Sequence, residues 1–327
     1  MFPTKVLVAV DGSEAAEHAA IEASKLCRMT GSELHVVHVV PAVSAWTGAE
    51  ALAWQSEGGK YVDELEEHNL RQGQTLLDEQ LGKISGSGAT VAGSHLKVGR
   101  VDAGVDDLAE ELDAGLLVVG SRGYGALRRA LMGSASLSLI YHAHRPVLVV
   151  RNREKSSQEG GESGDERHSG LSTGAILAAY DGSAESERAA GAGAELAGAF
   201  ETELHLASVV DMSQVIPYAP AYARIGWEEE IEQAEEETYK RLEKASDRIE
   251  AASSIQPTLH VLNGQPSAEM VRLGDELGAG LTLVGSRGRG GIKRALMGSV
   301  SKSVALHAGG SVLVFRPVDA EATAGDR

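Results

Sequence analysis

The stretch that decides the fold reads GSRGYGALRRALMGS at residues 120–134, and it returns as GSRGRGGIKRALMGS at residues 285–299. Eleven of the fifteen positions are identical. Each copy follows a short apolar run and leads into a segment with a helical pattern. A loop that recurs with the same surroundings indicates that one structural unit occurs twice in the chain.

Two further matches support this duplication. The sequence VAVDGS at 8–13 returns as AAYDGS at 178–183, and ELH at 33–35 returns at 203–205. Between the copies lies a segment rich in Glu, Gly and Ser with almost no apolar residues, which cannot bury a core of its own. The sequence therefore predicts one domain at 1–151, a flexible linker at 152–172, a second domain at 173–317 and a disordered tail at 318–327.

Apolar runs and helical patterns alternate along the first copy. We expect strands at Lys5–Val10, Leu34–Val40, Val91–Val98, Leu116–Val119 and Pro146–Val150. We expect helices from a cap at Ser13 to Met29, at Tyr61–Lys83, at Val101–Leu112 and at Ser134–His144. The second copy repeats this order. The alternation predicts an α/β protein with two tandem, doubly wound, Rossmann-like domains, each a five-stranded parallel sheet with helices on both faces.

The repeated loop has the residue types that bind phosphate. Gly120 and Gly123 allow positive φ and close approach of the backbone to a ligand. Gly133 and Ser134 begin a helix, where unpaired N–H groups and the helix dipole attract an anion, and Ser136 adds a hydroxyl donor. The corresponding residues of the second copy are Gly285, Gly288, Gly298, Ser299 and Ser301.

The charge distribution agrees with a phosphate ligand. The chain has a formal net charge of -17, yet the first loop carries Arg122 and two more arginines and no acid. The second carries Arg287, Arg289, Lys293 and Arg294 and no acid. The acidity of the whole chain argues against nucleic-acid partners and anionic membranes. The alternative is that these glycines only form turns and these arginines only solvate a surface loop.

Two aspartates are expected at the same edge of the sheet. Asp11 and Asp181 each follow the first strand of their copy, so their carboxylates could accept hydrogen bonds from a ribose or hold Mg²⁺ near phosphates. The alternative is a turn-forming Asp-Gly pair. Val39 and Val209 end the second strand of each copy and could line an adenine pocket, although alone they read as core valines.

Together these motifs resemble the universal stress protein (UspA) family in its tandem-domain form. The resemblance rests on Val-Asp-Gly-Ser, Leu-His-x-x-x-Val and G-x2-G-x9-G-S after the first, second and fourth strands. It implies an adenine nucleotide alpha hydrolase-like fold and ATP as the ligand of Asp11, Val39, Gly120, Gly123, Gly133 and Ser134, and of their counterparts in the second copy. It also implies pairing of the two domains through their last strands, within one chain or in a homodimer.

No set of residues typical of catalysis is recognisable in the sequence. G-x4-G-K-[ST], H-E-x-x-H and C-x-x-C are all absent. We therefore expect an ATP-binding stress-response or signalling protein that is not an enzyme. A slow ATPase or adenylyl-transfer enzyme, and a scaffold with nucleotide as structural filler, are the alternatives. The sequence shows no signal peptide or membrane span, and Cys27 is the only cysteine, so a cytoplasmic location is expected.

Overall fold

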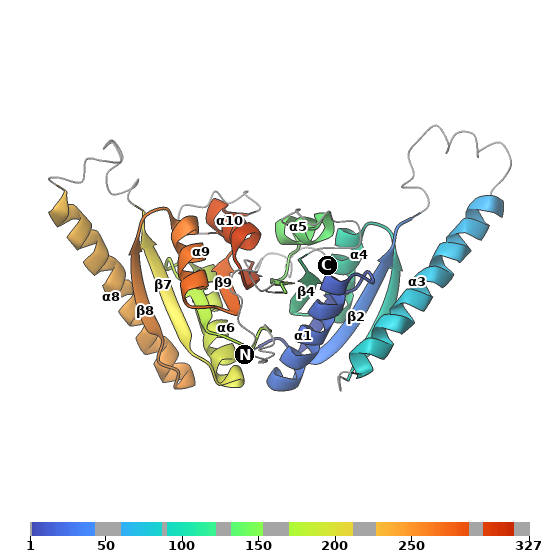
Figure 1. The fold of residues 1–327 in the computed structure, drawn as a ribbon, viewed down its shortest axis with the longest axis horizontal. Helices are drawn as coiled ribbons and strands as arrows, with labels where there is room; N and C mark the ends of the chain where they lie inside the picture. The colour runs from blue at the N-terminus through green and yellow to red at the C-terminus, as the bar shows by residue number, and fades with distance from the viewer. Residues whose placement is uncertain are drawn as a thin grey trace, which may run out of the picture. The chain divides into compact units, whose positions relative to one another are not determined.

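The computed structural model describes residues 2–42, 60–86, 90–121, 132–152, 170–211, 227–287 and 297–316. These residues form two compact units, one made of Pro3–Ala143 and one that contains the described residues from His144 onward. Strands alternate with helices in both units (Figure 1). The α/β fold class predicted from the sequence is confirmed.

The strands of the first unit are parallel. They are β1 (Lys5–Ala9), β2 (Glu33–Val40), β3 (Gly93–Val98) and β4 (Leu116–Gly120). Their order is β3-β2-β1-β4. The continuous apolar runs in β1, β2 and β4 are buried because helices cover both sides of a parallel sheet.

Within the described residues, four helices accompany these strands. They are α1 (Glu14–Thr30), α3 (Lys60–Gly86), α4 (Val101–Leu112) and α5 (Ser134–His142). The predicted ends of α1 are confirmed. The Ser13 side chain caps its first turn by accepting a hydrogen bond from the Ala16 N–H, and Gly31 ends it with a φ of 73°.

Neighbouring residues of β2 show which helices cover which face. A Cβ on Gly73 of α3 would lie 2.4 Å from Val40, and a Cβ on Gly104 of α4 would lie 3.3 Å from Val39. Since successive side chains of a strand point to opposite faces, α3 and α4 cover opposite faces of the sheet. The glycine at position 73 is required because the helix backbone approaches the strand so closely.

The second unit repeats this arrangement (Figure 1). Its strands are β6 (Ile176–Ala179), β7 (Leu204–Val210), β8 (Thr258–Asn263), β9 (Leu281–Gly285) and β10 (Ser311–Phe315). Its helices are α6 (Ala184–Phe200), α8 (Glu228–Ser253), α9 (Pro266–Glu276) and α10 (Ser299–His307). The strands form the predicted five-stranded parallel sheet, in the order β10-β9-β6-β7-β8.

One strand of the first copy belongs to the second unit. Strand β5 (Val147–Val150) pairs antiparallel with β10, with Leu148 opposite Leu313. Arg151 follows β5, and its guanidinium donates hydrogen bonds to the carbonyl oxygens of Ala305, Leu306 and Ala308 at the end of α10. The last strand of the first copy thus completes the sheet edge that β10 would otherwise leave open.

The core is aliphatic. The largest fully buried side chains are all leucine or isoleucine, among them Leu7, Ile140 and Ile176. No helix within the described ranges is long and apolar enough to cross a membrane. Most of the predicted linker (153–169) and the whole predicted tail (318–327) lie outside the described residues, so the predicted domain boundaries stay predictions.

Candidate functional site

An Asp-Gly-Ser turn leaves the carboxyl end of the first strand in both copies. Asp11 Oδ1 accepts hydrogen bonds from the backbone N–H of Ser13 at 3.0 Å and from its hydroxyl at 2.5 Å. Asp181 does the same with Ser183 at 3.0 and 2.6 Å. The intervening glycine has a φ of 81° or 83°, which disfavours other residues. Each aspartate therefore shapes the turn, as in the alternative left open by the sequence, and ligand contact by Asp11 and Asp181 stays a prediction.

The glycine that ends the fourth strand serves packing. Neither Gly120 nor Gly285 adopts the positive φ expected from the sequence, so that explanation is wrong for these two residues. A Cβ on Gly120 would lie 2.6 Å from the carbonyl oxygen of Ala15, and one on Gly285 would lie 2.8 Å from Cβ of Glu185. Glycine is needed here because the strand end packs directly on the first turn of α1 or α6, the helix that follows the first strand of each copy.

Helices α5 and α10 begin beside the end of the fourth strand of their copy. Gly133 caps α5 with φ -68° and ψ 152°, and Gly298 caps α10 with φ -73° and ψ 154°. Their N–H groups donate to the carbonyl oxygens of Ser121 at 2.9 Å and Ser286 at 2.7 Å. A glycine cap has no side chain to accept from the N–H groups of the first turn. Both helices therefore present polarised N–H groups where the fourth strand ends, the geometry that favours an anion.

The side chains of Ser136 and Ser301 hydrogen-bond these helix starts to the end of the fourth strand. The Ser136 hydroxyl donates to the carbonyl oxygen of Gly120 at 2.7 Å, and the Ser301 hydroxyl donates to that of Gly285. Both serines are buried. Their hydroxyl protons are thus engaged within the protein, and the predicted role as donors to a ligand is unavailable while these bonds persist. Ser134 and Ser299 occupy the first position of each helix and are exposed.

Three predicted site residues, Arg122, Gly123 and Gly288, lie outside the described residues. Arg287 is described, and its carbonyl oxygen lies 3.5 Å from the Ser183 hydroxyl, so the start of the second loop approaches the Asp181 turn.

The two predicted adenine-lining valines lie in the second strand of each copy. Val39 is buried against α4, and Val209 is half-buried in β7. Val39 already packs in the core. Contact of either valine with a ligand stays a prediction.

A polar contact between α4 and α5 was not predicted from the sequence. Asp102 in the first turn of α4 accepts a hydrogen bond from the Ser138 hydroxyl of α5 at 2.5 Å and from Arg100 Nη2 at 2.6 Å. The Arg100 guanidinium is the main cause that lowers the pKa of Asp102 to about 2, and the Ser138 hydroxyl adds to the effect. This contact therefore also positions α5, the helix that Gly133 caps.

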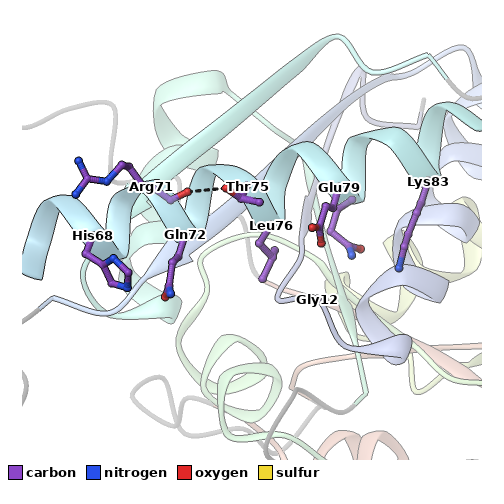
Figure 2. Close-up of a pocket in the computed structure, with 9 residues that line it drawn as sticks. Gly12, His68, Arg71, Gln72, Thr75, Leu76, Glu79 and Lys83 are labelled. Carbon is purple, nitrogen blue, oxygen red and sulfur yellow. Dashed lines mark hydrogen bonds between the residues drawn. The ribbon is translucent and has the colours of Figure 1, made fainter.

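A groove of about 430 Å³ lies between the inner side of α3 and the turn at Gly12 (Figure 2). Apart from Gly12 and Leu76, the residues that line it have polar or charged side chains, among them His68, Gln72, Gln80 and Lys83. Gln80 is only 3% exposed, and its Oε1 atom has no hydrogen-bond partner within the described residues. The sequence pattern predicted the helix but not this groove, because its walls come from segments far apart in the chain.

In the second copy an arginine of α8 approaches the equivalent turn. The Cδ of Arg241, at the position equivalent to Leu76, lies 3.1 Å from where a Cβ of Gly182 would be. Tyr180 stands where the first copy has Val10, and its hydroxyl is hydrogen-bonded to Glu187 and, at 3.0 Å, to Arg248. Burial, and then Glu187, raise the pKa of Tyr180 to about 12. The two copies therefore differ beside their first turns.

Comparison with known proteins agrees with the duplication of the chain. A profile of the universal stress protein family matches residues 3–151 and 173–316. A universal stress protein of Mycolicibacterium smegmatis is 29% identical over 316 residues, which cover 95% of this chain and 97% of that protein. One of Mycobacterium tuberculosis is 28% identical over 324 residues, covering 95% of this chain and 96% of that protein.

The fold is similar to that of solved structures. The crystal structure of a universal stress protein from Archaeoglobus fulgidus has a TM-score of 0.63 and 20% identity, with 97% of this chain and 99% of that chain covered. A putative universal stress protein from Pseudomonas aeruginosa has a TM-score of 0.57 and 19% identity, with 97% and 95% covered. At these identities the likeness concerns the fold alone.

Proposed function

Because this chain belongs to the universal stress protein family, we propose that it binds ATP at its two glycine-capped helix starts and acts as a nucleotide-dependent stress-response or signalling factor. The observation that carries this proposal is the duplicated start of α5 and α10. In both, a glycine cap leaves the first-turn N–H groups without a side-chain acceptor, at the end of the fourth strand. Such a helix start favours a phosphate.

The residues around these helix starts fit a nucleotide phosphate. Ser134 and Ser299 have hydroxyls at the first helical position, and Ser136 and Ser301 hold the helix start on the strand end. At the second loop the Ser286 hydroxyl is fully buried and has no hydrogen-bond partner within the described residues. A buried polar atom without a partner is costly, and a bound ligand could satisfy it.

We expect the carboxylates of Asp11 and Asp181 to contact the ribose of the nucleotide. Asp11 and Asp181 leave the first strand of each copy, at the same edge of the sheet as the helix starts, because the carboxyl ends of parallel strands share one edge. Any Mg²⁺ would arrive with the ATP phosphates, near these two carboxylates. No three His, Cys, Asp or Glu side chains gather as a metal site among the residues that the structure describes.

We propose that the chain binds ATP and does not catalyse a reaction of it. One oxygen of Asp11 and one of Asp181 each accept two hydrogen bonds from the turn serine, so these atoms already shape the turn. A slow ATPase or an adenylyl-transfer enzyme would need a general base, and no described contact favours one. A homodimer, and the absence of nucleic-acid partners in a chain of net charge -17, are part of the same proposal.

The decisive experiment places a negative charge at each helix start without harming the helix. Asp is favourable in the first turn of a helix by about 0.3–1 kcal/mol, so Ser134→Asp and Ser299→Asp should leave the fold intact while repelling a phosphate. Ser134→Asn and Ser299→Asn are the matched controls, since Asn has nearly the same size and no charge.

Calorimetric titration with ATP should then show up to two nucleotides per wild-type chain. We expect each Asp variant to weaken its own site about tenfold or more and each Asn variant to change it by less than about threefold. Adenosine, which has no phosphate, should be affected much less. Wild-type protein that binds no ATP, or Asp variants that bind it as well as wild type, would refute the proposal.

A further inference from the structure

Each copy contains a pair of histidines that the proposed nucleotide site does not use. His35 of β2 and His95 of β3 approach with 3.2 Å between Nδ1 and Nε2. His205 of β7 and His260 of β8 approach with 2.9 Å between the same atoms. The ring centroids lie 5.5 Å and 5.2 Å apart. Because the same two histidines approach each other in both copies, the contact is a feature of the repeated domain and not an accident of one copy.

The inner ring of each pair is buried. His35 is 9% exposed and His205 is 6% exposed, and the Nε2 atom of each has no hydrogen-bond partner within the described residues. The nearest acids are at the strand starts, with Glu33 Oε2 3.8 Å from His35 Nε2 and Glu203 Oε2 3.4 Å from His205 Nε2. A charge on either inner ring therefore receives little solvation.

The proton count of a histidine pair limits its charge. An N–H···N hydrogen bond needs one protonated and one bare nitrogen, so a pair can be neutral or carry one extra proton. A second extra proton puts hydrogens on both facing nitrogens and two positive charges on adjacent rings. The hydrogen bond is then lost, and the charges repel each other in a poorly solvated place.

The histidine pairs join each edge strand to its neighbour. Among the described strands, β3 and β8 lie at the ends of the strand order and pair with β2 and β7 on one side only. Most of their side chains are only partly buried. In the first copy a Cβ on Gly93 would lie 2.7 Å from His35 Nδ1, so the His35 ring lies across the backbone of the edge strand.

We propose that the two histidine pairs are acid-sensitive contacts, which hold β3 on β2 and β8 on β7 at neutral pH and release these edge strands when both rings of a pair become protonated. The inference is independent of nucleotide binding. It concerns the opposite end of the strands from the helix starts, because His35 and His205 lie near the beginning of β2 and β7.

Other charges face the first pair from its own strands and from α4. Glu33 lies near His35, and on the β3 side Lys97 and Glu111 of α4 form an ion pair at 2.7 Å. Lys97 lowers the pKa of His95 and Glu111 raises it, so their effects oppose each other. The larger causes that lower the pKa of His95 are burial and then His35.

Fewer charges surround the second pair. Glu203 faces His205, and burial followed by His205 lowers the pKa of His260. Helix α9 packs on β7 and β8, and its Arg272 is bridged to both Glu269 and Glu276. Beside the first pair, the neighbouring strand β1 carries another charged side chain, Lys5, whose Nζ donates a hydrogen bond to the carbonyl oxygen of Leu112.

The direction of the pH effect follows from these lowered pKa values. Below the ordinary histidine pKa of 6.5, the unfolded chain takes up protons that His95 and His260 resist in the folded protein. The unfolded state then binds more protons, so stability is complete above pH 6.5 and falls as the pH drops. The loss should be local at first, since edge strands open before the core.

The test is amide hydrogen exchange on the full chain at pH 7.5 and 5.5, corrected for the intrinsic pH dependence of exchange. In wild type we expect protection of peptides from β3 and β8 to fall about tenfold or more between these pH values, while β1 and β6 change little. His95→Gln and His260→Gln should each abolish the fall in their own edge strand. His68→Gln, an exposed histidine of α3, is the matched control.

Ring titration of wild-type protein by NMR provides a measurement that needs no variant. We expect the rings of His95 and His260 to titrate below 6.5, because burial and the neighbouring ring lower the pKa of each. Equal protection of β3 and β8 at both pH values, an unchanged fall in the Gln variants, or titration of His95 and His260 at or above 6.5 would each overturn the inference. If the Gln variants do not fold, the wild-type titration decides.

Discussion

Asp102 accepts a hydrogen bond from the Ser138 hydroxyl across 2.5 Å and thereby ties the first turn of α4 to α5. The second copy has Ser267 and Ser303 at the equivalent positions, so it lacks the carboxylate. A hydrogen bond to a charged group contributes more than one between neutral groups. The start of α5 is therefore held by a contact that the start of α10 does not have.

Removing this contact should destabilise the first unit. We expect Asp102→Asn and Ser138→Ala each to lower the free energy of unfolding by about 1–2 kcal/mol, because a charge-assisted hydrogen bond is lost. Guanidinium denaturation measures the change. Ser303→Ala in α10 is the matched control and should cost less than about 0.5 kcal/mol, since Ser303 Oγ has only a 3.4 Å contact with His307. Equal losses in Ser138→Ala and Ser303→Ala would contradict this account.

The same carboxylate predicts an acid dependence. The pKa of Asp102 is lowered to about 2 from 3.8, so the folded protein keeps it ionised where the unfolded chain is protonated. Its stabilising effect is complete above about pH 4 and is lost as the pH falls toward 2. Denaturation of wild type and Asp102→Asn between pH 5 and 2.5 should give curves that converge at the acid end. Curves that stay parallel would mean that Asp102 has an ordinary pKa.

Gly120 should not tolerate even a methyl group. A Cβ there would lie 2.6 Å from a backbone oxygen in α1, which cannot move aside as a side chain can. We expect Gly120→Ala to cost about 1–3 kcal/mol of folding free energy, measured by chemical denaturation. Gly82→Ala is the control, because a Cβ at Gly82 of α3 meets nothing within 4 Å. It should stabilise the protein by about 0.5–1 kcal/mol through higher helix propensity.

Arg151 should matter for stability although it lies outside every predicted site. Its guanidinium donates to three carbonyl oxygens at the end of α10, where the helix dipole favours a positive charge. Arg151→Ala should lower the free energy of unfolding by about 2 kcal/mol, and Arg151→Lys should restore only part of it. Arg71→Ala removes an exposed arginine and should change stability by less than about 0.5 kcal/mol.

Local signals predicted most of the fold. Ser13 and Gly31 mark the ends of α1 because capping depends on residues next to the helix, and α4 spans the predicted Val101–Leu112. The five parallel strands of the second unit follow from apolar runs that alternate with helices. The duplicated glycine loop also located both helix starts correctly.

What the sequence could not show depends on contacts between distant residues. The role of Gly120 comes from its distance to α1, and that of Asp102 from Ser138, 36 positions further along the chain. The sequence shows that His35 of the expected strand Leu34–Val40 recurs as His205, but the partners of these histidines on the edge strands appear only once the strands are in register. The groove beside Gly12 likewise needs α3 to be packed in place.

The antiparallel pairing of β5 with β10 limits how this chain can be divided. A fragment that begins in the segment between the copies would lack β5, and the backbone of Val312–Val314 would lose its partners along an apolar border. Such borders recruit other chains and lead to aggregation. A fragment that begins at His144 keeps both β5 and Arg151, so the place to separate the duplicated halves lies inside the first copy rather than between the two.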